Sequence, residues 1–301
     1  MRQGGCEAVI DPQSQKTDSA LSAKDYRSAV RPVWCAGCGN YGTWNAMTQA
    51  LADLKLDPDK IIMTSGIGCA SRFPYFMKGY TLHGVHGRAL PTAIGMKIAR
   101  PELTVIVVGG DGDGFSIGGG HIPHISRKNV DLTYVFSNNN VYGLTKGQTS
   151  PTSAMGQRTA TSPVGVTDPP INPVLWLISV GATFVARSFT ADLPHLRSMI
   201  TQAIQHPGFA VVEALTPCPT FNKEMDFKTL AQKVQAVPDT HDPSNRLAAM
   251  ALAMDVNKFY TGVLYREIRP TYMEYKAAVE KRLGRFADDR EGLRELINEF
   301  A

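Results

Sequence analysis

The sequence predicts an α/β fold, a three-layer, doubly wound, mainly parallel sheet that is followed by a helical C-terminal extension. Short, almost fully apolar segments alternate with helical patterns up to about residue 216. Apolar runs without polar alternation are typical of parallel strands that are buried on both faces. Since strands that alternate with helices are joined by right-handed crossovers, we expect helices on both faces of one sheet.

The elements follow from local patterns. Trp44, Met47, Leu51 and Leu54 recur on one helical face, which predicts a helix over 43–54. Apolar strands are expected at 61–63, 103–108, 131–137, 183–186 and 209–215, with a further segment at 80–85. Helices are expected at 90–99, after the strand at 103–108 up to about residue 128, and at 193–204.

Composition and patterning divide the chain into three expected regions. Residues 1–32 form a polar N-terminal arm, 33–225 the main domain and 226–301 a helical extension, in which Ser244 and Asp288 or Asp289 are expected helix caps. Within the domain, residues 149–173 are rich in Ser, Thr, Pro and Gly. This segment is too long for a plain connection, so we expect a loop that covers a site.

Charge and hydropathy exclude several classes of protein. The 301 residues carry a net charge of +4 with no block of Lys or Arg, which argues against nucleic-acid binding. No apolar run is long enough to span a bilayer. The first 30 residues lack the apolar core of a signal peptide, and together with cysteines suited to metal this favours a reducing cytoplasm.

A glycine-rich acidic turn follows the strand at 103–108. The small residues of Gly110-Asp111-Gly112 leave backbone N–H groups free to approach phosphate oxygens, and Asp111 supplies the hard oxygen ligand that Mg²⁺ prefers. Asn139 lies 28 positions later, after the next apolar strand. This arrangement predicts a metal and diphosphate site, although an ordinary strand-to-helix turn or another nucleotide site would also use a Gly-Asp-Gly sequence.

The Gly-Asp-Gly and Asn-Asn pair resembles the thiamine-diphosphate signature of decarboxylases, transketolases and 2-oxoacid oxidoreductases. By this resemblance the metal ligands are Asp111, Asn139 and the carbonyl of Val141. The interval favours Asp111 over Asp113, which would then lie near the diphosphate or the helix start. The implied cofactor-binding residues are completed by three glycines and one cysteine, Gly110, Gly112, Gly68 and Cys69.

Four of the five cysteines lie in turn-like settings. They are Cys35 and Cys38 in WCAGCGNYG, Cys69 in SGIGCAS and Cys218 in TPCPTFN. Cys6, in the polar arm, is interpreted as a bystander. A C-x-x-C pair can hold one metal or cluster, and soft thiolates favour zinc or iron–sulfur centres. The spacing alone leaves a four-cysteine metal site, a redox pair and unrelated buried thiols open.

Several motifs together carry a more specific resemblance. WCAGCGNYG, SGIGCASRFPYF, LHGVHGRALPTAIGMKIARP, GDGDGFSIGGGH, NNNVYGLTKGQTSPT and TPCP resemble the β subunit of 2-oxoacid:ferredoxin oxidoreductases, the 2-oxoglutarate type in particular, from about residue 33 to 222. In that family four cysteines hold a [4Fe-4S] cluster close to the thiamine ring. Cys35, Cys38, Cys69 and Cys218 match all four, so the resemblance implies an intact cluster.

The resemblance implies a reaction and partners. A 2-oxoacid and coenzyme A would give acyl-CoA and CO₂, with electrons leaving through the cluster to ferredoxin, and the reverse direction would fix CO₂. The substrate would be 2-oxoglutarate, giving succinyl-CoA, with pyruvate or another 2-oxoacid as the alternative. The Glu that activates thiamine comes from an α subunit in this family. No acidic residue here matches that motif, so we expect an (αβ)₂ assembly that is inactive without α.

Four residues are candidates for substrate contact. Arg72 and Lys146 are cations near the expected cluster and cofactor, and either can pair with the distal carboxylate of 2-oxoglutarate. Leu144 lies in the same loop as Lys146 and can set the pocket size, and His86 in HGR is expected to face the site. Surface or packing roles remain open for all four.

Two other classes of protein remain as rivals. A thiamine-dependent lyase or carboligase would use the same Gly-Asp-Gly and Asn features without needing four cysteines. A non-enzymatic four-cysteine electron-transfer module would leave those features unexplained.

Overall fold

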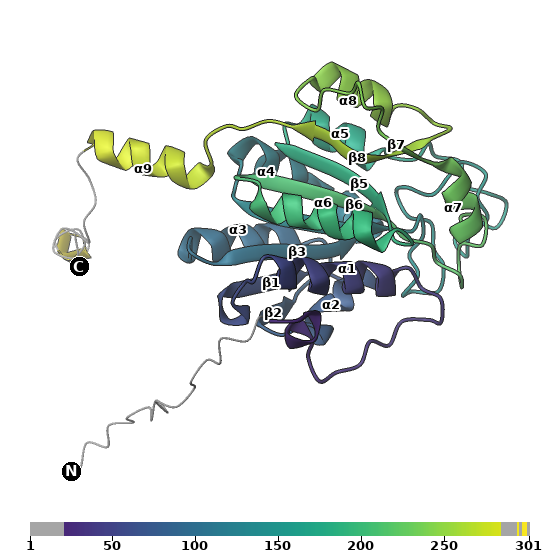
Figure 1. Ribbon diagram of the computed structural model, residues 1–301, viewed down its shortest axis with the longest axis horizontal. Coiled ribbons are helices and arrows are strands. Elements are labelled where there is room, and N and C mark those ends of the chain that lie inside the picture. The colour runs from purple at the N-terminus through teal and green to yellow at the C-terminus, as the bar shows by residue number, and fades with distance from the viewer. Residues whose placement is uncertain (1–20, 284–293, 295–296, 300–301) are drawn as a thin grey trace, which may run out of the picture.

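An eight-stranded sheet forms the centre of the protein (Figure 1). The computed structural model describes residues 21–283, 294 and 297–299. The strand order is β2-β1-β3-β4-β6-β5-β8-β7, and the neighbours are parallel except β5 and β8, which are antiparallel. The strands are β1 (Ile61–Ser65), β2 (Tyr80–His83), β3 (Thr104–Gly110), β4 (Leu132–Asn138), β5 (Phe184–Phe189), β6 (Phe209–Leu215), β7 (Val234–Ala236) and β8 (Phe259–Arg266).

Helices cover both faces of this sheet. One face packs against α1 (Asn40–Asp53) and α6 (Leu193–Gln205), and the other packs against α3 (Ala89–Ala99), α4 (Ile122–Lys128), α5 (Pro173–Ser179) and α8 (Arg246–Ala253). Side chains of β3 alternate between the two cores: Ile106 and Val108 join the α1 and α6 side, while Val105 and Val107 join the other. This confirms the predicted three-layer α/β class.

The strand order places a crevice between β1 and β3, the second and third strands of the sheet. The connection after β1 runs outward to β2, whereas the connection after the neighbouring β3 runs the other way to β4, so a switch point opens at the carboxyl ends of β1 and β3. Ser65 at the end of β1 lies opposite Val108, and Gly110 at the end of β3 lies opposite Ser137 of β4. The loops after β1, β3 and β4 therefore leave the sheet side by side.

Most of the expected elements are present, and some local differences have clear causes. Residues 113–117 form a π-helical turn and 119–121 a 3-10 turn before α4, in place of one continuous helix. The expected loop at 149–173 ends at α5. Asn172 accepts a hydrogen bond from the backbone N–H of Leu175, and Pro173 follows at the first helical position. Such an Asn-Pro pair is a recognised helix start that the sequence already contained.

The segment after Asp226 contains the expected helices and two strands that were not predicted. The helices are α7 (Phe227–Lys233), α8 and α9 (Tyr272–Leu283). β8 pairs with β5, so this segment extends the main sheet. The expected cap Ser244 is wrong because the neighbouring Asn245 accepts the N–H of Ala248 at the start of α8. Asp288, Asp289 and Cys6 lie outside the described residues, and the predicted domain boundaries stay predictions.

Among the described helices, which include the short α2 (Phe73–Phe76), none has the length and apolar character needed to cross a membrane.

Candidate functional site

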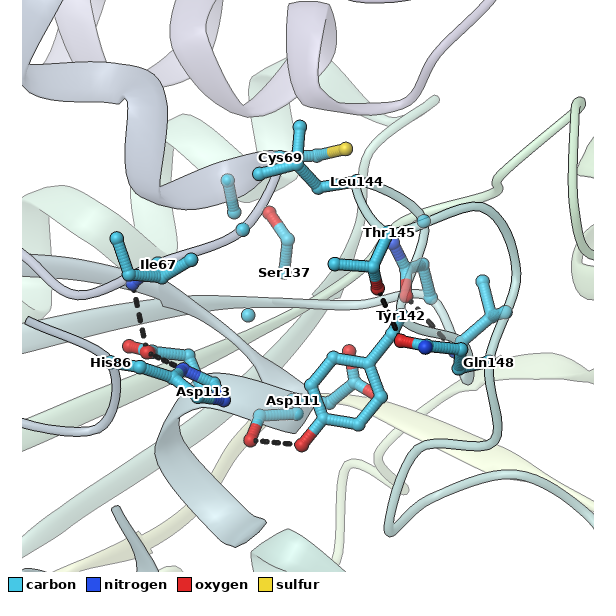
Figure 2. Close-up of a pocket in the computed structure, with 17 residues that line it drawn as sticks. Ile67, Cys69, His86, Asp111, Asp113, Ser137, Tyr142, Leu144, Thr145 and Gln148 are labelled. Carbon is cyan, nitrogen blue, oxygen red and sulfur yellow. Dashed lines mark hydrogen bonds and ion pairs between the residues drawn. The ribbon is translucent and has the colours of Figure 1, made fainter. Parts of the chain in front are cut away.

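A cavity of about 310 Å³ opens at the switch point, between the loops that follow β1, β3 and β4 (Figure 2). The predicted site residues on its wall are Gly68, Cys69, His86, Gly110, Asp111, Gly112, Asp113, Asn139, Val141 and Leu144. In the view of Figure 2, Cys69 and Leu144 lie at one end of the cavity and Asp111 and Asp113 at the other. The fold thus brings the predicted cofactor residues and one motif cysteine onto one wall.

Asp111 is a buried carboxylate, with only 2% of its surface exposed. Burial raises its pKa, and hydrogen bonds from Ser150, Thr152 and the backbone of Asn139 offset part of that rise. The Thr152 hydroxyl donates to its Oδ2 at 2.7 Å. No Lys, Arg or His among the described residues pairs with it. An ionised Asp111 is therefore a buried anion whose charge no protein cation balances.

Asp113 has a different environment two residues later. Its Oδ1 accepts the backbone N–H of Ile67 at 2.9 Å and the Nδ1–H of His86 at 2.7 Å (Figure 2). It also accepts the backbone N–H of Gly87 at 2.7 Å. A Cβ at Gly66 would lie 2.1 Å from the Asp113 carboxylate, so the chain needs glycine there. Asp113 therefore fastens the loops after β1 and β2 to the turn after β3.

The loop after β4 packs directly onto the Gly-Asp-Gly turn. The Tyr142 hydroxyl donates to the Gly112 carbonyl at 2.9 Å, and the Tyr142 ring fills the space that a Gly112 Cβ would need. Asn139 Oδ1 accepts the N–H of Val141 at 3.1 Å. Asn140 between them has a φ of 55°, a left-handed conformation that Asn tolerates well. These contacts fix the Asn139 and Val141 oxygens relative to β3.

Thr152 is a site residue that the sequence analysis did not single out, although it is the last residue of the quoted motif NNNVYGLTKGQTSPT. Its hydroxyl is close to Asp111 Oδ2 and also lies 3.0 Å from Asn138 Oδ1. It also lies in the hydroxyl-rich segment expected to cover a site, so both the motif and the composition pointed to this part of the chain. Ser137 was also missed; it lines the cavity and donates to the side-chain carbonyl of Asn40 at 2.8 Å.

The four motif cysteines come from three loops around one end of the cavity. The N–H of Cys38 donates to the carbonyl of Cys35 at 3.1 Å, closing the C-x-x-C turn. The sulfurs of Cys69 and Cys218 lie 3.6 and 3.7 Å from the position of a Cβ on Gly143. Burial raises the pKa of Cys38 to about 12 and that of Cys69 to about 11. Repulsion from the neighbouring cysteine thiolates makes a smaller contribution in the same direction.

These cysteines are close enough to affect one another's ionisation, but their sulfurs are not arranged around a single metal-ion position. Among the described residues, no three His, Cys, Asp or Glu side chains are arranged to hold a single metal ion. All four motif cysteines are free thiols.

The substrate candidates are placed unequally. His86 and Leu144 line the cavity, whereas Arg72 and Lys146 do not. Arg72 is half-buried and near enough to Cys69 to oppose the rise in its pKa. Lys146 is exposed, in a left-handed turn with a φ of 81°. In this chain alone, neither cation reaches the wall of the cavity.

Two family models match most of the described chain. "Thiamine pyrophosphate enzyme, C-terminal TPP binding domain" matches residues 66–214, and a model of the C-terminal part of the pyruvate ferredoxin oxidoreductase β subunit matches residues 218–281. The first match contains Asp111, Asn139 and the cavity, so this part is a thiamine-diphosphate-binding domain.

Individual relatives are more specific. The 2-oxoacid:ferredoxin oxidoreductase subunit beta of Saccharolobus solfataricus is 50% identical over 191 residues, 63% of each chain. The 2-oxoglutarate oxidoreductase subunit KorB of Mycobacterium tuberculosis is 46% identical over 224 residues, 72% of this chain and 60% of the relative. This chain thus spans about three fifths of the length of these two relatives.

A solved structure covers nearly the whole chain. A chain of the 2-oxoglutarate:ferredoxin oxidoreductase from Magnetococcus marinus, with 2-oxoglutarate, coenzyme A and succinyl-CoA bound, is 44% identical and superposes with a TM-score of 0.90. The match covers 94% of this chain and 97% of that one. At this identity and coverage the chain belongs to the 2-oxoacid:ferredoxin oxidoreductase β-subunit family, as its motifs predicted.

Proposed function

We propose that this chain is the β subunit of a 2-oxoglutarate:ferredoxin oxidoreductase. The reaction is 2-oxoglutarate, coenzyme A and oxidised ferredoxin to succinyl-CoA, CO₂ and reduced ferredoxin, and it is reversible. The observation that carries this proposal is the shared cavity wall, on which Asp111, Asn139 and Cys69 meet. The names of the Mycobacterium and Magnetococcus relatives support 2-oxoglutarate over pyruvate.

The donor set at the turn suits Mg²⁺. Asp111 Oδ, the Asn139 side-chain oxygen and the Val141 carbonyl would hold the ion, and all are the hard oxygens that Mg²⁺ prefers. A cation there would balance the buried charge of Asp111, which no described protein group balances. Asp113 is disfavoured as a ligand because three donors already occupy its Oδ1.

Thiamine diphosphate supplies carbanion chemistry when bound, and this chain positions it. The backbone of Gly110 and Gly112 would approach the diphosphate, which small residues permit. His86 is oriented by Asp113, which accepts its Nδ1–H at 2.7 Å. Nε2 is then the ring nitrogen left to exchange a hydrogen bond or a proton with a ligand in the cavity.

The cysteine environment suits an iron–sulfur cluster. A [4Fe-4S] cluster would be held by Cys35, Cys38, Cys69 and Cys218. Because the four thiolates of such a cluster bind different iron atoms, their sulfurs need not surround a single metal ion. Burial keeps Cys38 and Cys69 as thiols in the metal-free chain, and binding of iron would release their protons. The backbone N–H of Asn40 already donates to the Cys38 sulfur.

The proposal includes partners. An α subunit would supply the activating Glu, the active assembly would be (αβ)₂ in the cytoplasm, and ferredoxin would accept the electrons. A lyase or carboligase would not require four cysteines around the cavity, and an electron-transfer module would not require the thiamine domain.

Anaerobic co-purification with the α subunit tests the function. We expect reduction of ferredoxin with 2-oxoglutarate and coenzyme A, slower turnover of pyruvate, and visible absorption from iron. Preference for pyruvate would overturn the substrate assignment. Stoichiometric zinc without iron, or 2-oxoacid turnover without electron transfer, would overturn the oxidoreductase assignment.

Selectivity tests the two cations. Neither cation lines the cavity in this chain alone, so the test asks whether one of them reaches the substrate in the assembled enzyme. A charge-assisted hydrogen bond is worth about 1.5 to 3 kcal/mol, so Arg72→Met or Lys146→Met should then lower kcat/KM for 2-oxoglutarate roughly tenfold to a hundredfold and leave pyruvate nearly unchanged. Arg100→Met, an exposed arginine that does not line the cavity, is the control. If both variants keep the wild-type ratio of kcat/KM for 2-oxoglutarate to that for pyruvate, the distal carboxylate is bound by the partner subunit.

A further inference from the structure

A second cavity, of about 290 Å³, lies next to the first at the carboxyl ends of β4, β5 and β6. Asn138 and Thr152 line it, and Thr152 also contacts Asp111 of the first cavity. Its other walls come from the 149–173 segment and from the part of the chain after Met225. None of the predicted site residues lines it, so the proposed reaction leaves this cavity without a role.

Arg187 is the central charged group of this cavity. It is only 4% exposed, and its Nε donates to Glu213 Oε2 at 2.5 Å. The other Glu213 oxygen is taken by the Asn138 amide at 2.7 Å. The two terminal guanidinium nitrogens have no hydrogen-bond acceptor among the described residues. Because a guanidinium carries five N–H donors in a fixed fork, a buried Arg187 has donors left for a ligand in the cavity that it lines.

A second cation lines the same space. Lys233, at the end of α7, has one polar contact among the described residues, 4.0 Å from its Nζ to the sulfur of Met225. Two carboxylates also line the cavity, but Glu213 is engaged by Arg187 and Asn138. Asp255 accepts the N–H of Asn257 and forms no ion pair with either cation. The unpaired donors of the cavity are thus cationic.

The apolar part of the remaining wall comes mainly from Ile171, Pro173, Met225 and Phe259, and uncharged polar side chains, among them Asn140, Gln157 and Asn172, complete it. The volume lies just below the range of about 300 to 1,000 Å³ that is typical of drug-sized ligands, so a small molecule is the appropriate size. Two cations whose donors are not all paired, together with several apolar side chains, suit a ligand with one anionic group and a hydrocarbon part. Glu213 and Asp255 would repel a second carboxylate or a phosphate dianion.

We propose that this cavity binds a small aliphatic monocarboxylate. Its carboxylate would accept hydrogen bonds from the terminal nitrogens of Arg187 and from Lys233 Nζ, as guanidinium and ammonium groups recognise carboxylates elsewhere. Its hydrocarbon chain would lie against Met225 and Phe259. The site is separate from the diphosphate turn and goes beyond the proposed function, since binding requires neither thiamine diphosphate nor the cluster.

Calorimetric titration of the full chain with butyrate tests the proposal. We expect saturable binding of one butyrate per chain, and affinities for butyramide, succinate and inorganic phosphate at least tenfold weaker. Lys233→Gln should weaken butyrate binding roughly tenfold to a hundredfold, because it removes one charge-assisted hydrogen bond. Lys228→Gln is the matched control, since Lys228 is exposed on the same helix and does not line the cavity.

Arg187→Lys keeps a cation beside Glu213 but removes the planar guanidinium with its terminal N–H donors, so it should also weaken binding of butyrate. Lys233→Gln decides the question if Arg187→Lys fails to fold, as thermal melting would reveal. The proposal is overturned if butyramide binds as tightly as butyrate, if succinate or phosphate binds more tightly, or if Lys233→Gln leaves the affinity unchanged. Because these titrations omit the cofactors, they can fail while the proposed oxidoreductase function stands.

Discussion

The two cavities at the carboxyl edge of the sheet differ in the charge of the buried group that lacks a full set of partners. In the first, Asp111 is a buried anion without a described protein cation. In the second, Arg187 is a buried cation whose Nε meets Glu213 and whose terminal nitrogens meet no described acceptor. One sheet edge thus offers a place for a cation with its diphosphate and a place for an anion. The unsatisfied group, more than the size of each cavity, indicates which ligand belongs in it.

The largest expected effect concerns Asp111 in the first cavity, and the contrast between the two cavities is wrong if Asp111 is not needed for cofactor binding. We expect Asp111→Asn to abolish binding of thiamine diphosphate with Mg²⁺, because it removes the one charged ligand and leaves the diphosphate charge poorly compensated. Calorimetric titration with the cofactor and Mg²⁺ measures this.

Asp113→Asn is the matched control for that experiment. It should retain cofactor binding but lower the free energy of unfolding by about 1 to 3 kcal/mol, since a neutral amide satisfies the donors of Ile67, Gly87 and His86 less well. The opposite pattern, with Asp113 essential for the cofactor and Asp111 not, would reverse the roles given to the two carboxylates.

The cysteine end of the first cavity gives the next largest effect. Ser in place of Cys35, Cys38, Cys69 or Cys218 should lower the iron content and bleach the visible band of anaerobically prepared protein, because a hydroxyl is a poor substitute for a soft thiolate. Iron analysis and absorption spectra measure it. Cys6→Ser should leave both unchanged, and an equal loss in that variant would remove the distinction between motif and non-motif cysteines.

The second cavity is tested through stability. Arg187→Met should lower the free energy of unfolding by about 3 to 5 kcal/mol, because it leaves the Glu213 carboxylate buried without its cation. Arg187→Met with Glu213→Met should recover most of that loss, since it removes both charges. Urea denaturation measures both variants. A double variant no more stable than the single one would indicate that packing, and not the unpaired charge, is responsible.

The smallest effect concerns pH and the cofactor-free chain. Burial raises the pKa of Asp111 above its unfolded value, so the folded chain holds this proton more tightly than the unfolded chain does. Stability should therefore fall as pH rises from the unfolded pKa through the folded one. Asp111→Asn should show less of this fall in urea denaturation as the pH is raised above about 4, the ordinary pKa of an aspartate. A wild-type chain that gains stability relative to the variant over this range would contradict the assignment.

The two cavities also differ in how well the sequence predicts them. The first is built from residues next to strand ends in short motifs, so apolar strands and glycine-rich turns were enough to place Asp111, Asn139 and Cys69 together. The choice between Asp111 and Asp113 followed from spacing, but their different environments depend on the loops after β1 and β2 and on Thr152. No local pattern encodes those contacts.

The second cavity could not be predicted in this way. Arg187 and Glu213 lie within apolar strands, where one polar side chain gives no indication of its partner across the sheet. β8 was missed because its pairing with β5 is a long-range antiparallel contact, in a region where helical patterns dominate the neighbouring sequence. α5 could have been found from Asn172 and Pro173.

Thr152 shows how two such sites share one atom. Its hydroxyl lies within hydrogen-bond distance of Asp111 Oδ2 and of Asn138 Oδ1, and both are acceptors. A hydroxyl has a single proton, so it can serve only one of them fully at a time. If the proposed metal ion bound Asp111, the carboxylate would compete less well and the proton would move toward Asn138, whose amide in turn donates to Glu213. The position of one hydrogen atom would then report whether a cation is bound to the neighbouring carboxylate.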